Sequence, residues 1–248
     1  MKLKVNKLVK SYHLRPVLDL PDATFGNYPL EGLIGPNGAG KSTLMGLLTR
    51  RIPATTGFIE FEADGKVHDL NTKQAYEVAR LGLVKTNQRI QNFESLSIRQ
   101  SLLLAGASAE HESLSAVFGE PEISDACNST IDDYLQRFKF TNPDGFANSA
   151  GEKKLLDILR CLILKPRMLL MDEPTAGLPE DVTLQVMEEI TKQVEENNIR
   201  VLIVEHDLDL IWRYCEYVHF LSDGEMLCDG TPDQVRTNDY VAEKYLGV

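Results

Sequence analysis

A glycine-rich stretch near the N-terminus has the composition of a phosphate-binding loop. The segment GPNGAGKST at 35–43 matches the pattern G-x-x-x-x-G-K-[ST] in full, and it joins an apolar, strand-like run to a helix-like run. Its glycines let backbone N–H groups converge on phosphate oxygens at the positive end of a helix. Lys41 is expected to reach the β- and γ-phosphates of a nucleotide, and Ser42 to bind Mg²⁺. The residues expected to bind the nucleotide are Gly35, Asn37, Gly38, Ala39, Gly40, Lys41, Ser42 and Thr43.

Two adjacent carboxylates follow an apolar run further along the chain. In MLLMDEP, at 168–174, Asp172 and Glu173 end a stretch with the continuous hydrophobicity of a buried parallel strand. A carboxylate in this position lies at the carboxyl edge of a sheet, where open α/β folds bind ligands. We expect Asp172 to hold Mg²⁺ and Glu173 to orient or polarise an attacking water. Each motif also has a simpler explanation when it is considered alone. GPNGAGKST could be a structural turn, and Asp172 and Glu173 could be an exposed acidic pair at a strand end.

The stretch NSAGEKK, at 148–154, precedes an amphipathic helix and has two explanations. Ser149 and Glu152 have the spacing of a capping box, which starts a helix without any ligand. Ser149 and Gly151 also offer a hydroxyl and an unobstructed backbone N–H at a helix N-terminus, which attracts phosphate. The two explanations are compatible, because a capped helix still presents its first turn.

Hydrophobic periodicity predicts the elements that position these residues. Strands are expected at 3–9, 30–34, 81–85, 168–171 and 201–205, hairpins at 58–70 and 218–230, and helices at 41–50, 181–196 and 208–214. Strands alternate with helices at both ends of the chain, which predicts a core with a mostly parallel sheet.

The segment from about 92 to 164 has a different, helical pattern. In TIDDYLQRFKF, the side chains of Ile131, Tyr134, Leu135 and Phe138 recur at i, i+3, i+4 and i+7, which is one face of a helix. SIRQSLLLAGA, at 97–107, is also helix-like. We expect a helical subdomain inserted into the α/β core.

Composition limits the class of protein. Acidic residues outnumber Lys and Arg by 37 to 26, for a net charge of −11, which argues against direct nucleic-acid binding. No apolar run approaches the roughly 20 residues that span a bilayer, and the N-terminus lacks the apolar core of a signal peptide. The four cysteines form no CxxC pair and are expected to be reduced thiols. We therefore expect a cytoplasmic protein whose membrane contact is made only through partners.

The motifs and their order resemble the nucleotide-binding subunits of ABC transporters over essentially the whole chain. The resemblance implies ATP as the ligand and adds three residues. Tyr12, in VKSYHLRP, matches the aromatic residue that stacks on adenine, although a half-buried strand tyrosine is the alternative. Gln88 matches the glutamine that senses Mg²⁺ and water, with Gln91 as its rival. His206 matches the histidine that contacts the γ-phosphate, so the implied catalytic set is Glu173, His206 and Gln88, and the implied metal set Ser42, Gln88 and Asp172.

The resemblance also gives NSAGEKK a function. It stands where the family has LSGGQ, which closes over the ATP of a second subunit in a head-to-tail dimer. Asn148, Ser149, Gly151 and Glu152 would act on that partner's ATP, and the departures from LSGGQ are Asn148 for Leu, Ala150 for the first Gly and Glu152 for Gln. An intact phosphate loop with an altered signature favours a heterodimer of ATPase subunits over a homodimer.

Within the family, several stretches resemble the ATPases of branched-chain amino acid and urea-type importers. These are LVKTNQ, NFESLSIRQSL, TAGL, VEHDLDLI and the ending GTPDQVRTNDYVAEKYLG. The lipopolysaccharide-export ATPase is the nearest rival. A soluble ABC ATPase acting on ribosomes or DNA, and a subunit that binds ATP without hydrolysing it, are the alternatives from other classes.

Together these inferences predict one ABC ATPase domain over 1–248. The expected fold is an α/β P-loop NTPase core with an antiparallel β subdomain and an inserted α-helical subdomain. The protein should hydrolyse ATP with Mg²⁺, bind transmembrane permease subunits and a second ATPase subunit, and lie on the inner face of the cell membrane.

Overall fold

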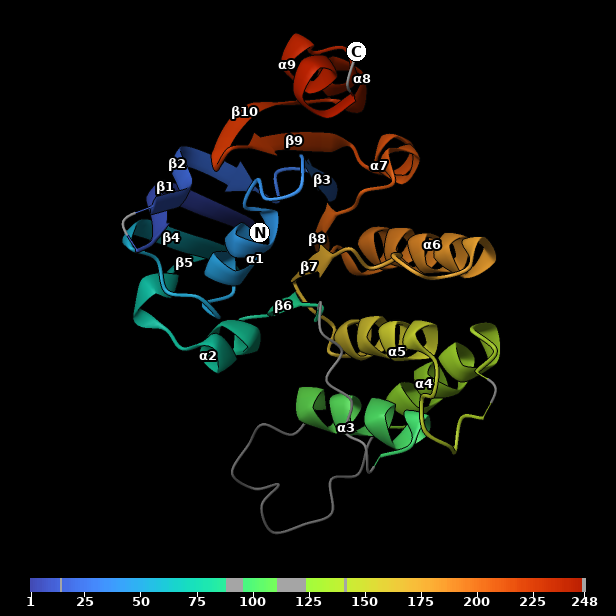
Figure 1. Ribbon diagram of the computed structural model, residues 1–248. Helices are drawn as coiled ribbons and strands as arrows, with labels where there is room; N and C mark the ends of the chain where they lie inside the picture. Colours follow the sequence, from blue (N-terminus) through green and yellow to red (C-terminus); the bar gives the residue numbers. More distant parts are fainter. Residues whose placement is uncertain (14, 88–95, 111–123, 141, 247–248) are drawn as a thin grey trace. The chain divides into compact units, whose positions relative to one another are not determined.

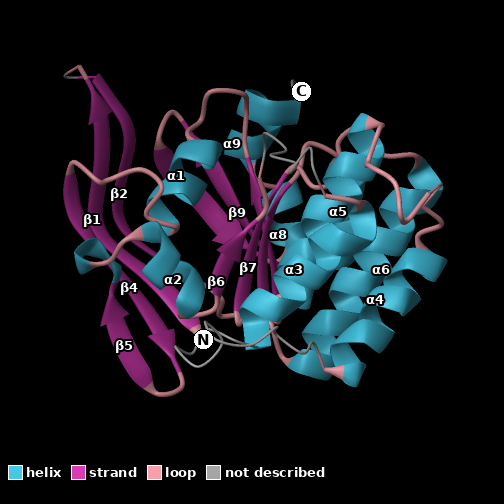
Figure 2. Ribbon diagram, turned by 90° about the horizontal axis from the view of Figure 1, so that it is seen from below, coloured by secondary structure: helices cyan, strands magenta, loops and turns pink. Residues whose placement is uncertain are grey.

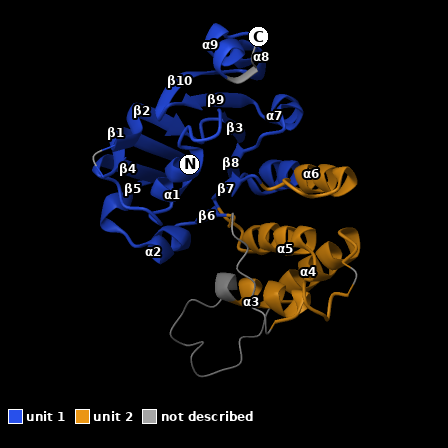
Figure 3. Cartoon of the chain, viewed as in Figure 1, with its two compact units in different colours: residues 1–85, 167–173, 190–248 blue, residues 86–166, 174–189 orange. Residues whose placement is uncertain are grey.

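The computed structural model of the chain describes residues 1–13, 15–87, 96–110, 124–140 and 142–246 (Figure 1). The chain divides into two compact units (Figure 3). We call residues 1–85, 167–173 and 190–248 the sheet unit, and residues 86–166 and 174–189 the helical unit. Gln88 and Gln91 lie outside the described residues.

The sheet unit contains two sheets. A four-stranded antiparallel sheet has the order β2-β1-β4-β5, formed by β1 (Lys2–Tyr12), β2 (Arg15–Phe25), β4 (Thr56–Ala63) and β5 (Lys66–Asp69). A six-stranded sheet has the order β10-β9-β3-β8-β7-β6, formed by β3 (Leu30–Ile34), β6 (Leu83–Lys85), β7 (Met168–Asp172), β8 (Arg200–Val204), β9 (Tyr217–Ser222) and β10 (Glu225–Gly230). Only the β9–β10 pair of this second sheet is antiparallel. The expected combination of a mostly parallel core sheet and an antiparallel portion is confirmed.

Burial follows the role of each strand. Every residue of β3 and β7 is buried, as expected for strands covered on both faces, whereas β1 alternates between buried and exposed positions. One hydrophobic cluster joins residues of both sheets to helix α1 (Lys41–Leu48). The helix that follows the phosphate loop is therefore anchored by its apolar side chains in the core.

Short helices complete the sheet unit, and some of them are labelled in Figure 2. They are η1 (Leu70–Thr72), α2 (Ala75–Arg80), α7 (Leu208–Tyr214), α8 (Pro232–Arg236), α9 (Asp239–Val241) and η3 (Ala242–Leu246). Within the described ranges, no helix combines the length and hydrophobicity that a bilayer-spanning segment requires.

The helical unit contains α3 (Ile98–Glu110), α4 (Asp125–Arg137), α5 (Ala150–Ile163) and the first part of α6 (Glu180–Asn197). The fully buried Glu189 of α6 accepts a hydrogen bond from the Tyr134 hydroxyl at 3.1 Å and pairs with Arg137, which ties α4 to α6. The unit extends beyond the expected range of about 92–164, because 174–189 pack with it. Sequence periodicity could not show this, since β7, a strand of the sheet unit, separates the added segment from the other helices.

Candidate nucleotide-binding and catalytic site

The phosphate loop connects β3 to α1 through backbone conformations that favour glycine. Gly35 has φ of 152°, and a Cβ added there would lie 1.9 Å from the backbone oxygen of Leu221. Gly40, the N-cap of α1, has φ of 103° and makes no side-chain cap. The carbonyl of Ala39 accepts a hydrogen bond from the N–H of Gly224, in the β9–β10 turn, at 3.1 Å. The loop is thus held by its surroundings, and no side chain caps the first turn of α1.

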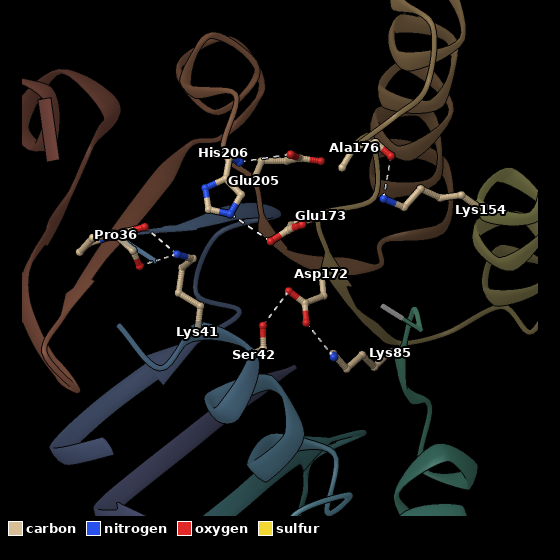
Figure 4. A network of polar contacts seen from close by, with 11 residues as sticks. Pro36, Lys41, Ser42, Lys85, Lys154, Asp172, Glu173, Ala176, Glu205 and His206 are labelled. Atoms are coloured by element: carbon tan, nitrogen blue, oxygen red, sulfur yellow. Dashed lines mark hydrogen bonds and ion pairs between the residues drawn. The ribbon is translucent and has the colours of Figure 1, made fainter. Parts of the chain in front are cut away.

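The Lys41 side chain folds over the phosphate loop and contacts its backbone. Its ammonium donates hydrogen bonds to the carbonyl oxygens of Gly35 at 2.6 Å and Pro36 at 2.9 Å (Figure 4). Burial lowers the pKa of Lys41, while the negative charges of Glu173 and Asp172 oppose that shift. A positive charge held against the loop is suited to phosphate oxygens, which are stronger acceptors than neutral carbonyls.

Two of the three side chains expected to bind metal, Ser42 and Asp172, lie next to each other, and the third, Gln88, is outside the described residues. The Ser42 hydroxyl, in the first turn of α1, donates to Asp172 Oδ1 at 3.4 Å, at the end of β7. The other oxygen of that carboxylate, Oδ2, accepts a hydrogen bond from Lys85 Nζ at 2.9 Å. A hydroxyl and a carboxylate are the oxygen donors that Mg²⁺ uses beside nucleotide phosphates, so the donor set fits this ion.

Glu173 and His206 come from neighbouring strand ends and meet. His206 Nε2 lies 3.0 Å from Glu173 Oε1, and the two side chains are 41% and 28% exposed. Glu173 has φ of 51°, a left-handed conformation that costs a non-glycine residue of order 1–3 kcal/mol. Its N–H donates to the carbonyl of Val204 at 2.8 Å, which holds the residue in that conformation. Strain at a carboxylate that faces a histidine is typical of a functional site.

A family profile described as ABC transporter matches residues 23–176, which include the phosphate loop, Asp172 and Glu173. The chain belongs to the ABC transporter family. Membership of this family makes the chain a nucleotide-binding protein and an ATPase.

Known relatives of this ABC ATPase carry specific names. It is 31% identical over 226 residues to the high-affinity branched-chain amino acid transport ATP-binding protein BraF of Pseudomonas aeruginosa, covering 87% of this chain and 86% of BraF. It is 32% identical over 233 residues to LivG of Escherichia coli K12, which has the same description, covering 89% and 88% of the two chains. The expected resemblance to this group is confirmed.

Solved structures confirm the fold of the ABC ATPase. A nucleotide-free ATP-binding cassette from an ABC transporter superimposes with a TM-score of 0.78 at 25% identity, over 100% of both chains. The ADP conformation of such a cassette gives a TM-score of 0.76 at 26% identity, again over 100% of both chains.

The stretch NSAGEKK, expected to be the signature, begins α5 with a complete capping box. Ser149 Oγ accepts a hydrogen bond from the N–H of Glu152 at 3.0 Å, and Glu152 Oε2 accepts from the N–H of Asn148 at 3.1 Å and of Ser149 at 3.4 Å. A Cβ on Gly151 would meet nothing closer than Leu178 Cδ2 at 3.6 Å, which is an ordinary contact. The cap accounts for the serine and the glutamate, but not for the glycine.

Tyr12 is the last residue of β1, and it is 45% exposed. The ammonium of Lys10 lies 4.8 Å from the centroid of its ring. An exposed ring beside a cation suits stacking on a base, and it also suits an ordinary surface tyrosine.

Sequence reasoning missed Lys85. This residue ends β6, and it reaches Asp172 because β6 pairs with β7, where Lys85 stands opposite Leu170. A lysine at the end of a predicted strand was the only available signal, since the order of strands in the sheet was unknown.

Proposed function

We propose that this ABC ATPase energises an importer of branched-chain amino acids, urea or related small polar solutes. BraF and LivG, which are both named for branched-chain amino acid transport, match most of the chain. They favour this group over the lipopolysaccharide-export ATPase and over ABC ATPases that act on ribosomes or DNA. Transmembrane permease subunits would hold the chain at the inner face of the cell membrane.

The observation that carries the hydrolysis in this proposal is the proximity of Ser42 to Asp172 and of Glu173 to His206, beside the N-terminus of α1 (Figure 4). The loop N–H groups bind the phosphates of ATP, and Lys41 exchanges its carbonyl partners for phosphate oxygens. Ser42 and Asp172, with Gln88 assigned from the sequence, would hold Mg²⁺, which would supply positive charge beside the phosphates.

Glu173 and His206 provide the chemistry at the reacting atoms. Glu173 orients a water for attack on the γ-phosphorus and polarises its O–H bond. The bond from the γ-phosphorus to the oxygen that bridges the β- and γ-phosphates breaks, and ADP departs with that electron pair while the proton of the water passes to a carboxylate or phosphate oxygen. His206 holds Glu173 in position through the 3.0 Å contact and offers a donor to the γ-phosphate.

A second ATPase subunit completes the site in this proposal. A glycine in the first turn of a helix costs about 0.5–1 kcal/mol relative to alanine, yet no steric contact in the helical unit requires Gly151. The need for it would arise from phosphates of the other subunit. Glu152 adds negative charge at the same helix N-terminus, which weakens attraction for phosphate. A partner with a stronger signature, in a heterodimer, would compensate.

The test uses the complete transporter, reconstituted in lipid vesicles with the subunits that co-purify with this chain. Glu173→Gln should retain ATP binding while ATP hydrolysis by this site falls at least 100-fold, because an amide cannot accept the proton. ATP-driven leucine uptake should fall with it. Glu196→Gln, which neutralises an exposed carboxylate of α6, is the matched control. Unchanged hydrolysis in Glu173→Gln contradicts the role of Glu173, and hydrolysis without uptake of leucine or urea contradicts the importer assignment.

A further inference from the structure

Asp172 forms a buried ion pair with Lys85, a residue outside the motifs that define the site. Lys85 Nζ lies 2.9 Å from Asp172 Oδ2, and the two side chains are 8% and 0% exposed (Figure 4). Both residues lie at the carboxyl edge of the parallel sheet, on the adjacent strands β6 and β7. A carboxylate with no exposed surface requires a compensating charge or hydrogen bonds, and Lys85 supplies both.

The two oxygens of Asp172 have different partners. Oδ1 lies 3.4 Å from the Ser42 hydroxyl, whereas Oδ2 receives the ammonium of Lys85. This arrangement holds the rotation of the carboxylate and directs Oδ1 toward the Ser42 hydroxyl, where Mg²⁺ would bind. Mg²⁺ demands near-ideal octahedral geometry, and it is commonly bound through one or two carboxylates together with substrate phosphates.

The charges also couple the metal to the nucleotide. An ammonium beside the carboxylate cancels its charge, so a divalent cation without nucleotide would meet a neutral pair and the repulsion of Lys85. ATP brings additional negative charge from its phosphates, which offsets that repulsion. On this reasoning a divalent cation would bind more tightly with nucleotide than without it.

We propose that Lys85 is a positioning residue and resident counter-ion of Asp172, which orients Oδ1 toward Ser42 and makes divalent-metal binding dependent on nucleotide. The proposal rests on the assignment of Asp172 as a metal ligand in the proposed function. A purely structural ion pair would stabilise the strand ends equally well, but it would not control metal binding in the absence of ATP.

The experiment measures metal binding by the full chain without nucleotide. Mn²⁺ binding is followed by electron paramagnetic resonance, and thermal unfolding is followed with and without Mg²⁺. The native chain should bind Mn²⁺ weakly and show no shift of the unfolding temperature with Mg²⁺. Lys85→Met should bind Mn²⁺ at least tenfold more tightly and regain stability when Mg²⁺ is added, because the metal replaces the missing cation. Lys85→Arg should behave like the native chain.

Two further variants keep the test decisive. Lys4→Met breaks an exposed pair with Glu62 at 3.4 Å in the same unit, and it should show no response to metal. The double variant Lys85→Met with Asp172→Asn leaves no charge at the pair, so it should fold even if Lys85→Met does not, and it should lose the metal response. Tight Mn²⁺ binding by the native chain would overturn the proposal, as would metal-insensitive behaviour of Lys85→Met or a response that survives in the double variant. None of these outcomes depends on hydrolysis or transport, so failure here is distinguishable from failure of the proposed function.

Discussion

Two helix N-termini of this chain are assigned to phosphate, and they differ in how much of their sequence the chain itself explains. At α1, no side chain caps the helix, and Gly40 stands at its N-cap with φ of 103°. At α5, Ser149 and Glu152 form a complete capping box. Gly35, beside the first helix, is required by the backbone oxygen of Leu221, whereas Gly151 has room for a side chain.

This difference distinguishes residues that contacts within the chain explain from a residue that such contacts do not explain. In the phosphate loop, steric contacts within the sheet unit account for a glycine, and the uncapped helix end remains for a ligand of the same chain. In NSAGEKK, helix capping accounts for Ser149 and Glu152, whereas no contact within the helical unit requires glycine at position 151. In the proposed function, the reason for that glycine is the ATP of a second subunit.

The largest expected effect is at Gly35. Gly35→Ala would place Cβ 1.9 Å from the Leu221 oxygen in a backbone conformation that disfavours alanine, so we expect a loss of about 3 kcal/mol or more of unfolding free energy. Chemical denaturation of the lone chain measures it. The matched control is Gly38→Ala, since Gly38 also has positive φ, of 83°, but no atom lies within 4 Å of the added Cβ. Its cost should be only about 1 kcal/mol, for left-handed backbone alone. Equal denaturation midpoints for the two variants would contradict the claim that a steric contact requires glycine at position 35.

Ser149→Ala should have an intermediate effect. The variant loses the acceptor for the N–H of Glu152, and we expect a cost of about 1 kcal/mol in unfolding free energy. Ser149→Asp restores a capping acceptor and should recover that stability, while turnover of the assembled transporter stays low because a carboxylate repels phosphate. If Ser149→Asp restores both stability and turnover, the hydroxyl serves the cap alone.

Gly151→Ala should change stability least and in the opposite direction. With no contact closer than 3.6 Å, the added methyl group should stabilise α5 by about 0.5–1 kcal/mol in thermal unfolding of the lone chain. Turnover of the assembled transporter should nevertheless fall about tenfold, measured in a complex whose other ATP site has been disabled. Undiminished turnover in that background would mean that Gly151 does not face a phosphate, and the contrast between the two helix N-termini would then reduce to their caps.

Features that depend on neighbours along the chain could be predicted before the fold was known. GPNGAGKST identified the loop, because the positions of its glycines and lysine are set by a single strand–turn–helix connection. The β4–β5 hairpin was predictable from Asp64-Gly65, where both residues have positive φ. MLLMDEP similarly identified Asp172 and Glu173 as residues at a strand end.

Which strand ends meet could not be predicted, because it depends on the order of the strands in the folded sheet. The order β8-β7-β6 brings His206 to Glu173 and Lys85 to Asp172, although 33 and 87 residues separate these pairs along the chain. Residues 174–189 likewise join the helical unit through Glu189, which Tyr134 and Arg137 contact from α4. Periodicity reports which face of an element is apolar, but pairing between distant segments follows from packing of the whole core, so it appears only once the chain is folded.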